Sequence, residues 1–356
     1  KMYTYHPPAP PTIRQLLSHT AGFAYGNHTN SFLDRRMLEM KIMDEATSSD
    51  LIDNLSTLPY ARAPGAEWQY SIASDLQGAM IERITGRSLD AFLTQELFEP
   101  LGMNDTGFFV DDDQLNRVSG VTYHNSYGLS YDTLKPATFE AQSQTFFKGG
   151  AGLFSTQADY ARFLQFLSDE GRVLERQLLR PETLKAFRTN AIRYRGKPAV
   201  VSGSGTSAGL GYGFGVGTIE NPFIADMAAP KGSYYWRGTL GTWFWVDPEN
   251  EIFFIAMIQS SSELEEDMLR DTRLMLRVSS IFSAASDTAC VREDDKDRET
   301  GVDSTRPMSS LKCGVAHLTD MCSSPQQVIN TQEHAMVAKM VTHILSKVSM
   351  CIRNIY

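Results

Sequence analysis

Tyr70 is placed for acid–base chemistry, because it stands directly ahead of an expected helix. Pro64-Gly65 marks a turn before it, and apolar residues then recur at three- and four-residue spacing over positions 72–84, as in an amphipathic helix. Ser71 and Gly86 are the candidate N-cap and C-cap of that helix. A phenol here lies near the positive end of the helix dipole, which stabilises the phenolate slightly. The position therefore meets one requirement of a general base.

The composition is that of a globular chain, since 42% of its 356 residues are apolar and a core of ordinary size can be built from them. The formal charge of −9 at pH 7, with no cluster of Lys and Arg, argues against nucleic acid or anionic lipid as a partner. No apolar run approaches the roughly 20 residues of a membrane-spanning helix, so no transmembrane segment is expected. The histidines and cysteines show no metal-ligand spacing and no phosphate-binding loop occurs, so neither a metal nor a cofactor is predicted.

The elements around Tyr70 are expected to form a helical region followed by a sheet. Apolar periodicity predicts helices over residues 12–20, 32–44, 49–58, 72–86, 88–99 and 156–167, and another from Pro181. From residue 210 the period becomes that of strands, expected over residues 212–218, 233–237, 239–246 and 251–260, with a turn at 247–250. A long helix is expected over 264–283. Residues 107–148 show no strong period and are predicted to form a loop.

Five short motifs follow one another in an order typical of one family. They are Thr12-Ile13-Arg14-Gln15-Leu16-Leu17-Ser18-His19-Thr20-Ala21-Gly22, Pro64-Gly65 with Trp68-Gln69-Tyr70-Ser71, Pro100-Leu101-Gly102-Met103-Asn104-Asp105-Thr106, Gly149 to Thr156, and Trp236-Arg237-Gly238-Thr239 with Gly241-Thr242-Trp243-Phe244. From residue 12 to about residue 260 the chain therefore resembles the penicillin-binding, β-lactamase-related serine hydrolases, which include class C β-lactamases, DD-peptidases and related esterases.

The resemblance implies a β-lactamase/transpeptidase-like fold, an α/β fold of the α+β type. A helical subdomain over residues 12–190 is expected to lie beside the C-terminal part of an antiparallel sheet over residues 210–260. We expect the whole domain to cover residues 1–282, incomplete at its N-terminus. Residues 283–356 are rich in Asp, Glu, Ser and Thr, which predicts a disordered tail, with a helical pattern over 330–352.

The resemblance also implies a mechanism. In such enzymes a serine attacks a carbonyl, a lysine three residues later on the same helix assists its deprotonation, and a tyrosine from a second loop shuttles the proton. By position Tyr70 is that tyrosine. Trp236, Arg237 and Gly238 take the place of the family's Lys-Thr-Gly on a strand facing the nucleophile, and the N–H of Thr239 is the implied oxyanion donor. A free phenol has a pKa of about 10, so neighbouring cations must lower it before it acts as a base at neutral pH.

Two departures from the family pattern bear on function. Ile72 stands where the family has an asparagine, which favours an ester over a lactam or a peptide amide as substrate. The family's Ser-x-x-Lys precedes the helix that starts at Thr12 and is not found there, so we expect the nucleophile, its lysine and two N-terminal strands to be missing from this chain. Ser309 and Lys312 fit the pattern, but they follow every motif that they should precede.

The resulting prediction is a serine hydrolase that forms an acyl-enzyme from a small-molecule ester or amide. One alternative is an inactive, truncated relative that acts as a binding module. Another places Ser207 in the Gly-x-Ser-x-Gly elbow of an α/β-hydrolase, with Asp247 and His317 as partners. That elbow requires a strand before it and a helix after it, whereas the pattern lies in a Gly/Ser loop ahead of an expected strand.

Each candidate residue also has a purely structural interpretation. Tyr70 and Trp236 belong to residue types that commonly pack in cores through their rings. His19 is typical of a residue that forms hydrogen bonds at a helix end. The glycines at 149–152 are typical of a structural turn.

Overall fold

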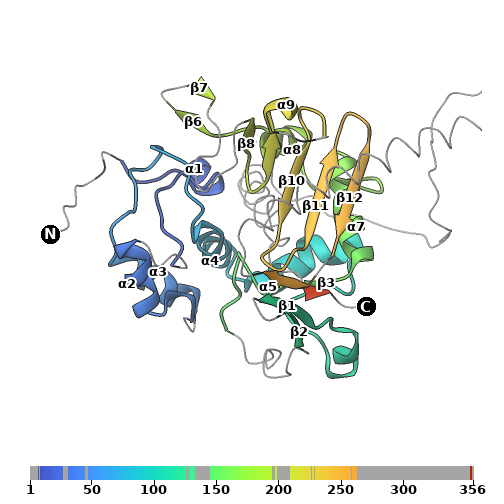
Figure 1. Ribbon diagram of the computed structural model, residues 1–356, viewed down its shortest axis with the longest axis horizontal. Helices are drawn as coiled ribbons and strands as arrows, with labels where there is room; N and C mark the ends of the chain where they lie inside the picture. The colour runs from blue at the N-terminus through green and yellow to red at the C-terminus, as the bar shows by residue number, and fades with distance from the viewer. Residues whose placement is uncertain are drawn as a thin grey trace, which may run out of the picture.

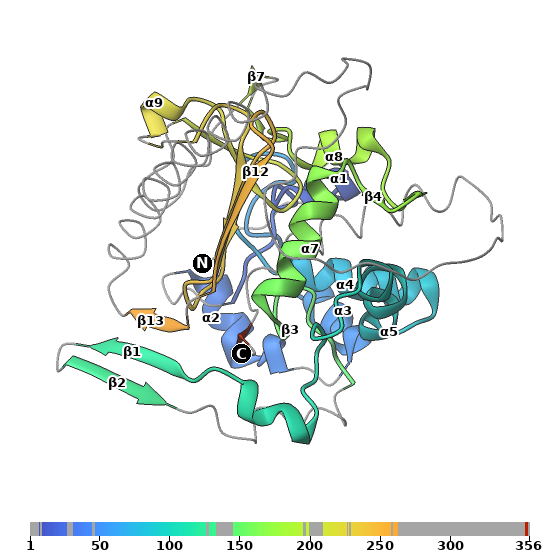
Figure 2. The ribbon, with the colours of Figure 1, turned by 90° about the vertical axis from the view of Figure 1, so that its right-hand side faces the viewer.

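The computed structural model describes residues 7–262 apart from 8, 27–30, 45–46, 126–127, 133–144, 195–196, 199–208, 226, 228 and 258, together with residues 353–354. Helices of the N-terminal half lie beside an antiparallel sheet, and helix α7 packs between the sheet and these helices (Figures 1 and 2). The expected long helix over 264–283, the tail and the pattern over 330–352 lie outside the described residues.

The main sheet has five antiparallel strands in the order β12-β11-β10-β9-β8. The strands are β8 (Leu210–Tyr212), β9 (Gly217–Ile219), β10 (Tyr234–Arg237), β11 (Trp243–Asp247) and β12 (Ile252–Ala256). Trp236 of β10 is paired with Phe244 of β11. Every residue of β11 is buried, whereas all five of β12 are half-buried. Among the described strands β12 therefore forms one edge of the sheet.

Three of the predicted strands were wrong in their bounds. The strand expected over 251–260 is only Ile252–Ala256, because its pairing with β11 ends at Ala256, and turns interrupt the other two. Residues 212–218 form the ends of β8 and β9, joined by a hairpin turn in which the N–H of Gly213 donates to the carbonyl of Val216 (2.8 Å). The strand expected from residue 239 begins only at Trp243, since the N–H of Gly238 donates to the carbonyl of Thr242 (2.7 Å) and closes a turn there. The turn at 247–250 is confirmed.

Polar side chains begin several helices at the positions where helix N-terminal N–H groups need an acceptor. Thr12, Ser31, Thr47, Ser88 and Thr156 each accept a hydrogen bond from the N–H three residues later. The helices are α1 (Ile13–Leu17), α2 (Phe32–Glu39), η1 (Ile42–Asp44), α3 (Ser48–Ser56), α4 (Ala73–Thr85), α5 (Leu89–Leu93), the π-helical turn η2 (Thr94–Phe98), α6 (Glu99–Leu101), η3 (Asp112–Arg117), α7 (Gln157–Ser168), α8 (Pro181–Phe187) and α9 (Pro222–Ala225).

The region expected to be a loop contains a hairpin, so that prediction was wrong over residues 121–132. Strands β1 (Val121–Asn125) and β2 (Gly128–Asp132) are antiparallel, and β13 (Ser260–Ser262) pairs with β1 in parallel. The remaining short pairs are β3 (Phe154–Ser155) with β14 (Arg353–Asn354), β4 (Arg172–Val173) with β5 (Arg176–Gln177), and β6 (Arg193–Tyr194) with β7 (Lys197–Pro198). The prediction failed because polar residues such as His124 and Ser130 interrupt the alternation of apolar and polar residues by which a strand is recognised in a sequence.

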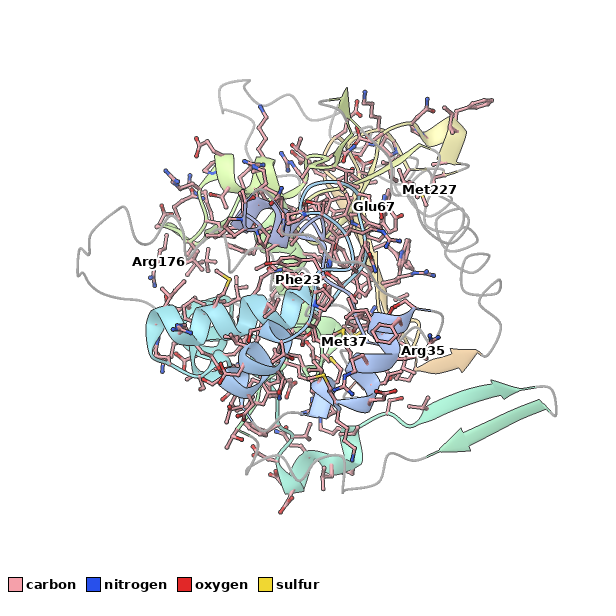
Figure 3. All side chains as sticks on the ribbon, turned by 90° about the vertical axis from the view of Figure 1, so that its left-hand side faces the viewer. Phe23, Arg35, Met37, Glu67, Arg176 and Met227 are labelled. Carbon is pink, nitrogen blue, oxygen red and sulfur yellow. The ribbon has the colours of Figure 1, made fainter. Side chains whose placement is uncertain are left out.

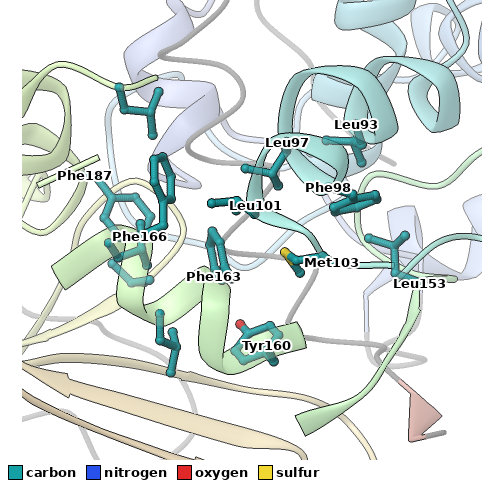
Figure 4. Close-up of a cluster of buried hydrophobic side chains, with 14 of the residues drawn as sticks. Leu93, Leu97, Phe98, Leu101, Met103, Leu153, Tyr160, Phe163, Phe166 and Phe187 are labelled. Atoms are coloured by element: carbon teal, nitrogen blue, oxygen red, sulfur yellow. The ribbon is translucent and has the colours of Figure 1, made fainter. Parts of the chain in front are cut away.

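The largest hydrophobic cluster joins helix α7 to the helices on one side and the sheet on the other. Tyr160, Phe163 and Phe166 of α7 are almost fully buried in it and face side chains of α5, η2 and the segment after α6 (Figure 4). The Tyr160 ring also lies 5.7 Å from that of Phe244 in β11. A second cluster under α2 and α3 includes Met37 (Figure 3).

Asp105, in the turn after α6, forms a bidentate ion pair with Arg117 (2.7 and 2.8 Å). The hydrogen bond from Arg117 lowers the pKa of this carboxyl below its ordinary value. Because the pKa is lower in the folded protein, the stabilisation is present above the ordinary carboxyl pKa and is lost as the pH falls through the folded value.

We expect Asp105→Asn to lower the free energy of unfolding by about 1 kcal/mol at pH 7, the usual size for a partly exposed ion pair. Urea titrations at pH 7 and at decreasing acid pH measure it, and the difference from wild type should shrink as the pH falls. Asp111→Asn, at an exposed carboxylate close by, is the matched control. A difference that stayed constant with pH would contradict the ion-pair explanation.

Candidate active site

The loop that carries Tyr70 is held by the segment that follows α1. Backbone hydrogen bonds join them. The N–H groups of Gly65, Gln69 and Ile72 donate to the carbonyls of Thr20, His19 and Ala24 (2.7, 2.9 and 3.0 Å), and those of Ala61 and Arg62 donate to the carbonyl of Gly22 (2.7 and 3.2 Å). Close approach of the two segments requires glycine at position 22, since a Cβ there would lie 2.1 Å from the carbonyl oxygen of Arg62. The Thr12–Gly22 motif and the Tyr70 motif are thus two halves of one local structure.

Helix α4 begins three residues after Tyr70, and its start differs from the sequence prediction. Ile72 is the N-cap and provides no side-chain cap. The prediction of Ser71 as N-cap was wrong by one position. The Ser71 hydroxyl still accepts from the N–H of Ala73 in the first turn (3.4 Å), and it also lies 2.9 Å from Nδ1 of His19. Gly86 is the C-cap in the left-handed conformation, as predicted.

The structure brings Tyr70 and Trp236 together although they lie far apart in the sequence. Their ring centroids are 6.1 Å apart. The ring of Tyr25 lies 5.2 Å from that of Tyr70, and the ring of Tyr212 in β8 lies 5.1 Å from that of Trp236. Trp68, 5.3 Å from Tyr212, completes this aromatic cluster. Tyr70, Trp68 and Trp236 are half-buried.

Two tyrosines of the aromatic cluster, Tyr70 and Tyr212, differ in their suitability as a base. Tyr212 is fully buried, and burial raises its pKa well above the ordinary value, because a phenolate there would lose its hydration. Tyr212 therefore stays protonated at neutral pH. Tyr70 is partly exposed at the helix start, which makes it the better candidate.

The other residues of the candidate oxyanion strand lie at the end of β10. Arg237 is the last residue of the strand and is paired with Trp243, while Gly238 is buried in the turn that follows. Thr239 is exposed at the tip of this turn. Residues 236–239 thus extend from the aromatic cluster, where Trp236 lies, to the solvent-exposed end of the β10–β11 hairpin.

Ile72 points away from this cluster. It is fully buried in the second hydrophobic cluster, with Leu51 and Leu55 of α3. A polar amide from this position is therefore absent from the surface near Tyr70.

The glycine-rich bend before β3 fits against the first turns of α4. A Cβ on Gly149 would lie 2.1 Å from the carbonyl oxygen of Ser74, and the N–H of Gly150 donates to the buried carboxylate of Asp75 (3.1 Å). This close packing is the structural role that the glycine-turn interpretation predicts.

The elbow alternative is wrong. Ser207 itself lies outside the described residues, but strand β8 starts at Leu210, directly after Gly209, where the elbow needs a helix. The surrounding sheet is antiparallel, unlike that of an α/β-hydrolase. Ser309 and Lys312 also lie outside the described residues.

Several residues of the site carried no functional signal in the sequence. Tyr25 and Tyr212 belong to no recognised motif, and His19 was expected only to serve the helix end. Their common feature is contact with Tyr70 or Trp236, which only the folded chain shows.

Across the part of the chain that the structure describes, no group of three metal-ligating side chains is arranged to hold an ion. Among the described residues, no helix is both long and apolar enough to cross a membrane.

Comparison with known proteins identifies the family. A family model described as beta-lactamase matches residues 3–279. The chain belongs to the beta-lactamase family. This confirms the resemblance that the ordered motifs indicated.

Curated relatives within this family are distant in sequence. An uncharacterized protein of Mycobacterium tuberculosis is 29% identical over 260 residues, which cover 72% of this chain and 64% of that protein. Lovastatin esterase of Penicillium rubens is 27% identical and is matched over 76% of this chain and 70% of its own length. Monacolin J acid methylbutanoyltransferase of Aspergillus terreus is 28% identical, with 70% and 62% covered. The chain thus spans under two thirds of the first of these relatives.

Solved structures confirm the β-lactamase/transpeptidase-like fold. EstCE1, a hydrolase with promiscuous acyltransferase activity, matches with a TM-score of 0.58 at 23% identity, covering 70% of this chain and 67% of that chain. Simvastatin synthase from Aspergillus terreus matches with a TM-score of 0.59 at 23% identity, covering 76% and 68%. A penicillin-binding protein homologue from Pyrococcus abyssi matches at 0.50 and 19% identity, covering 71% and 52%. At these identities the likeness concerns the fold alone.

Proposed function

We propose that this beta-lactamase family chain provides the tyrosine base and the oxyanion strand of a serine esterase or acyltransferase. The observation that carries the proposal is the meeting of Tyr70 with Trp236, since their rings lie 6.1 Å apart. Two motifs that the family places around one reacting carbonyl thus share one site.

An uncharged ester fits this site better than a peptide or a lactam. Its described wall is aromatic, with Trp68, Tyr70 and Trp236 half-buried, and Ile72 turns its side chain into the core. The names of two relatives, an esterase and a methylbutanoyltransferase, agree with chemistry on small acyl esters. The amide alternative would require a polar group where Ile72 supplies none.

The proposed reaction proceeds in two steps. A serine oxygen attacks the ester carbonyl as its proton passes to the Tyr70 oxygen, and the N–H of Thr239 donates to the developing oxyanion. The alcohol then leaves with the proton from Tyr70, which yields an acyl-enzyme. Water or a second alcohol attacks this intermediate by the reverse sequence, which gives hydrolysis or acyl transfer.

The nucleophile is the part of the proposal that most needs a direct experiment. We propose a Ser-x-x-Lys, because the lysine cation stabilises the phenolate of the base. A fluorophosphonate probe, followed by mass spectrometry of the labelled peptide, identifies the serine in this chain and in any longer form of it that cells produce. We expect a single adduct, on the serine of a Ser-x-x-Lys, and an unchanged adduct in the Ser207→Ala variant.

The same experiment distinguishes the non-catalytic alternative. If neither the 356-residue chain nor any longer form of it is labelled or hydrolyses p-nitrophenyl esters, the catalytic proposal is wrong. A chain that still binds such esters would then act as a binding module.

A further inference from the structure

His19 occupies a backbone position that normally favours glycine. Helix α1 ends in the motif in which the N–H of Thr20 donates to the carbonyl of Gln15 (2.8 Å) and that of His19 to the carbonyl of Leu16 (3.3 Å). The residue at this place adopts the left-handed conformation, and His19 has φ +53°. A side chain there is strained relative to glycine, because its Cβ crowds the following carbonyl oxygen. The helix end alone does not require an imidazole. The presence of histidine at this position is therefore explained by the contacts of its side chain.

The imidazole of His19 is fully buried and faces Ser71. Its Nδ1 lies 3.1 Å from the backbone N of Ser71 and 2.9 Å from the Ser71 hydroxyl. A backbone N–H can only donate, so Nδ1 is the acceptor and carries no proton. The proton of a neutral ring then sits on Nε2, and the observed hydrogen bond is incompatible with a doubly protonated ring.

His19 thereby binds the chain on both sides of Tyr70. Its carbonyl accepts from the N–H of Gln69 (2.9 Å), and its ring accepts from the N–H of Ser71. The ring also lies against the phenol, with centroids 4.8 Å apart and an interplanar angle of 33°. The backbone before the tyrosine, the backbone after it and one face of its ring all contact the same residue.

We infer that His19 is the positioning residue for Tyr70, an inference that rests on the proposed function. Because the ring is neutral, it supplies no charge to the phenol. Its effect is geometric: the Nδ1 acceptor fixes the peptide between residues 70 and 71 and so directs the phenol oxygen toward the reacting carbonyl. Small misplacements of a catalytic group reduce rate strongly.

Two variants separate the acceptor from the ring. His19→Phe keeps an aromatic ring but has no acceptor for the Ser71 N–H, whereas His19→Asn tolerates the left-handed conformation and retains an acceptor oxygen. We expect the phenylalanine variant to lower kcat for ester hydrolysis by roughly tenfold to a hundredfold with KM within about threefold, and the asparagine variant to restore most of kcat. Equal losses in both variants, or a loss only in KM, would overturn the inference.

A readout that needs no turnover keeps this test separate from that of the proposed function. With 3-fluorotyrosine at position 70, we expect one sharp 19F resonance in the otherwise unchanged chain and in His19→Asn, and a broadened or split one in His19→Phe. An unchanged resonance in His19→Phe would refute positioning even if Tyr70 proves catalytic. Conversely, Tyr70→Phe without effect on hydrolysis would refute the function and leave the 19F result standing.

A measurement on the unsubstituted chain guards against variants whose site is distorted. Nitrogen-15 NMR of the His19 ring in that chain reports the tautomer directly, and His19→Asn serves only to assign the signal by its loss. We expect an unprotonated Nδ1 and a protonated Nε2 at neutral pH. A proton on Nδ1 would exclude the hydrogen bond on which the inference depends.

Discussion

Tyr70→Phe is expected to lower kcat/KM for hydrolysis of a p-nitrophenyl ester by roughly a hundredfold to ten-thousandfold, the usual contribution of a general acid–base residue. The substitution removes only the phenol oxygen. The ring contacts with His19, Tyr25 and Trp236 remain available to phenylalanine, so the fold should be preserved. Steady-state kinetics on the form that the fluorophosphonate labels, with urea unfolding of both proteins, measures the effect.

Tyr212→Phe is the matched control in the same aromatic cluster. Within the part of the chain that the structure describes, the Tyr212 hydroxyl is buried and has no hydrogen-bond partner, and burial keeps it protonated by raising its pKa. Its loss should change kcat/KM by less than about threefold, since no proton transfer is assigned to it. Equal losses in the two variants would show that the cluster matters for packing and that Tyr70 is not the base.

The sequence motifs were sufficient to predict the fold because each depends on local chemistry. Thr12 and Ser88 are hydrogen-bonding N-caps, and Gly86 adopts the left-handed C-cap conformation. The strand that ends at Arg237 has the expected bounds within one residue. These features follow from backbone hydrogen bonding and allowed φ values near the residues concerned. Their order along the chain then indicated the family.

The candidate site was less predictable because its contacts are between distant segments. Ser71 was expected to be the N-cap of α4. Its hydroxyl does accept from the N–H of Ala73 (3.4 Å), but it also contacts a buried group from another segment, Nδ1 of His19 (2.9 Å). The strand expected over 212–218 folds into a hairpin whose first strand places Tyr212 beside Trp236. Periodicity within one segment carries no information about either contact. The role of Tyr70 and of residues 236–239 accordingly remains a proposal that the kinetic experiments test.

These contacts make the fold around α1 part of the site. Tyr70 is held by hydrogen bonds from residues 69 and 71 to His19, and His19 is held by the end of α1. A change that separates the segment after α1 from the loop over 61–72 should therefore reduce both stability and activity. Substitution of Gly22 by alanine adds one methyl group at the contact between the two segments and should separate them.

Gly22→Ala is expected to lower the free energy of unfolding by roughly 3 kcal/mol, as the sum of two effects. Gly22 has φ +86°, where a Cβ costs about 1–2 kcal/mol. The added Cβ would also lie 2.1 Å from the carbonyl oxygen of Arg62, and relieving such a clash costs about 1–3 kcal/mol. The carbonyl of Gly22 itself accepts from the N–H groups of Ala61 and Arg62, so the loop cannot move away without losing hydrogen bonds.

Gly86→Ala isolates the first of these two effects. Gly86 has φ +68°, and a Cβ there meets nothing within 4 Å, so this variant should lose only about 1 kcal/mol. Urea titrations of both variants give the difference, which we assign to the contact with Arg62. Similar losses in the two variants would mean that the segments separate easily. In that case Gly22→Ala should also leave the proposed ester hydrolysis unchanged, because the loop that carries Tyr70 would not depend on their close approach.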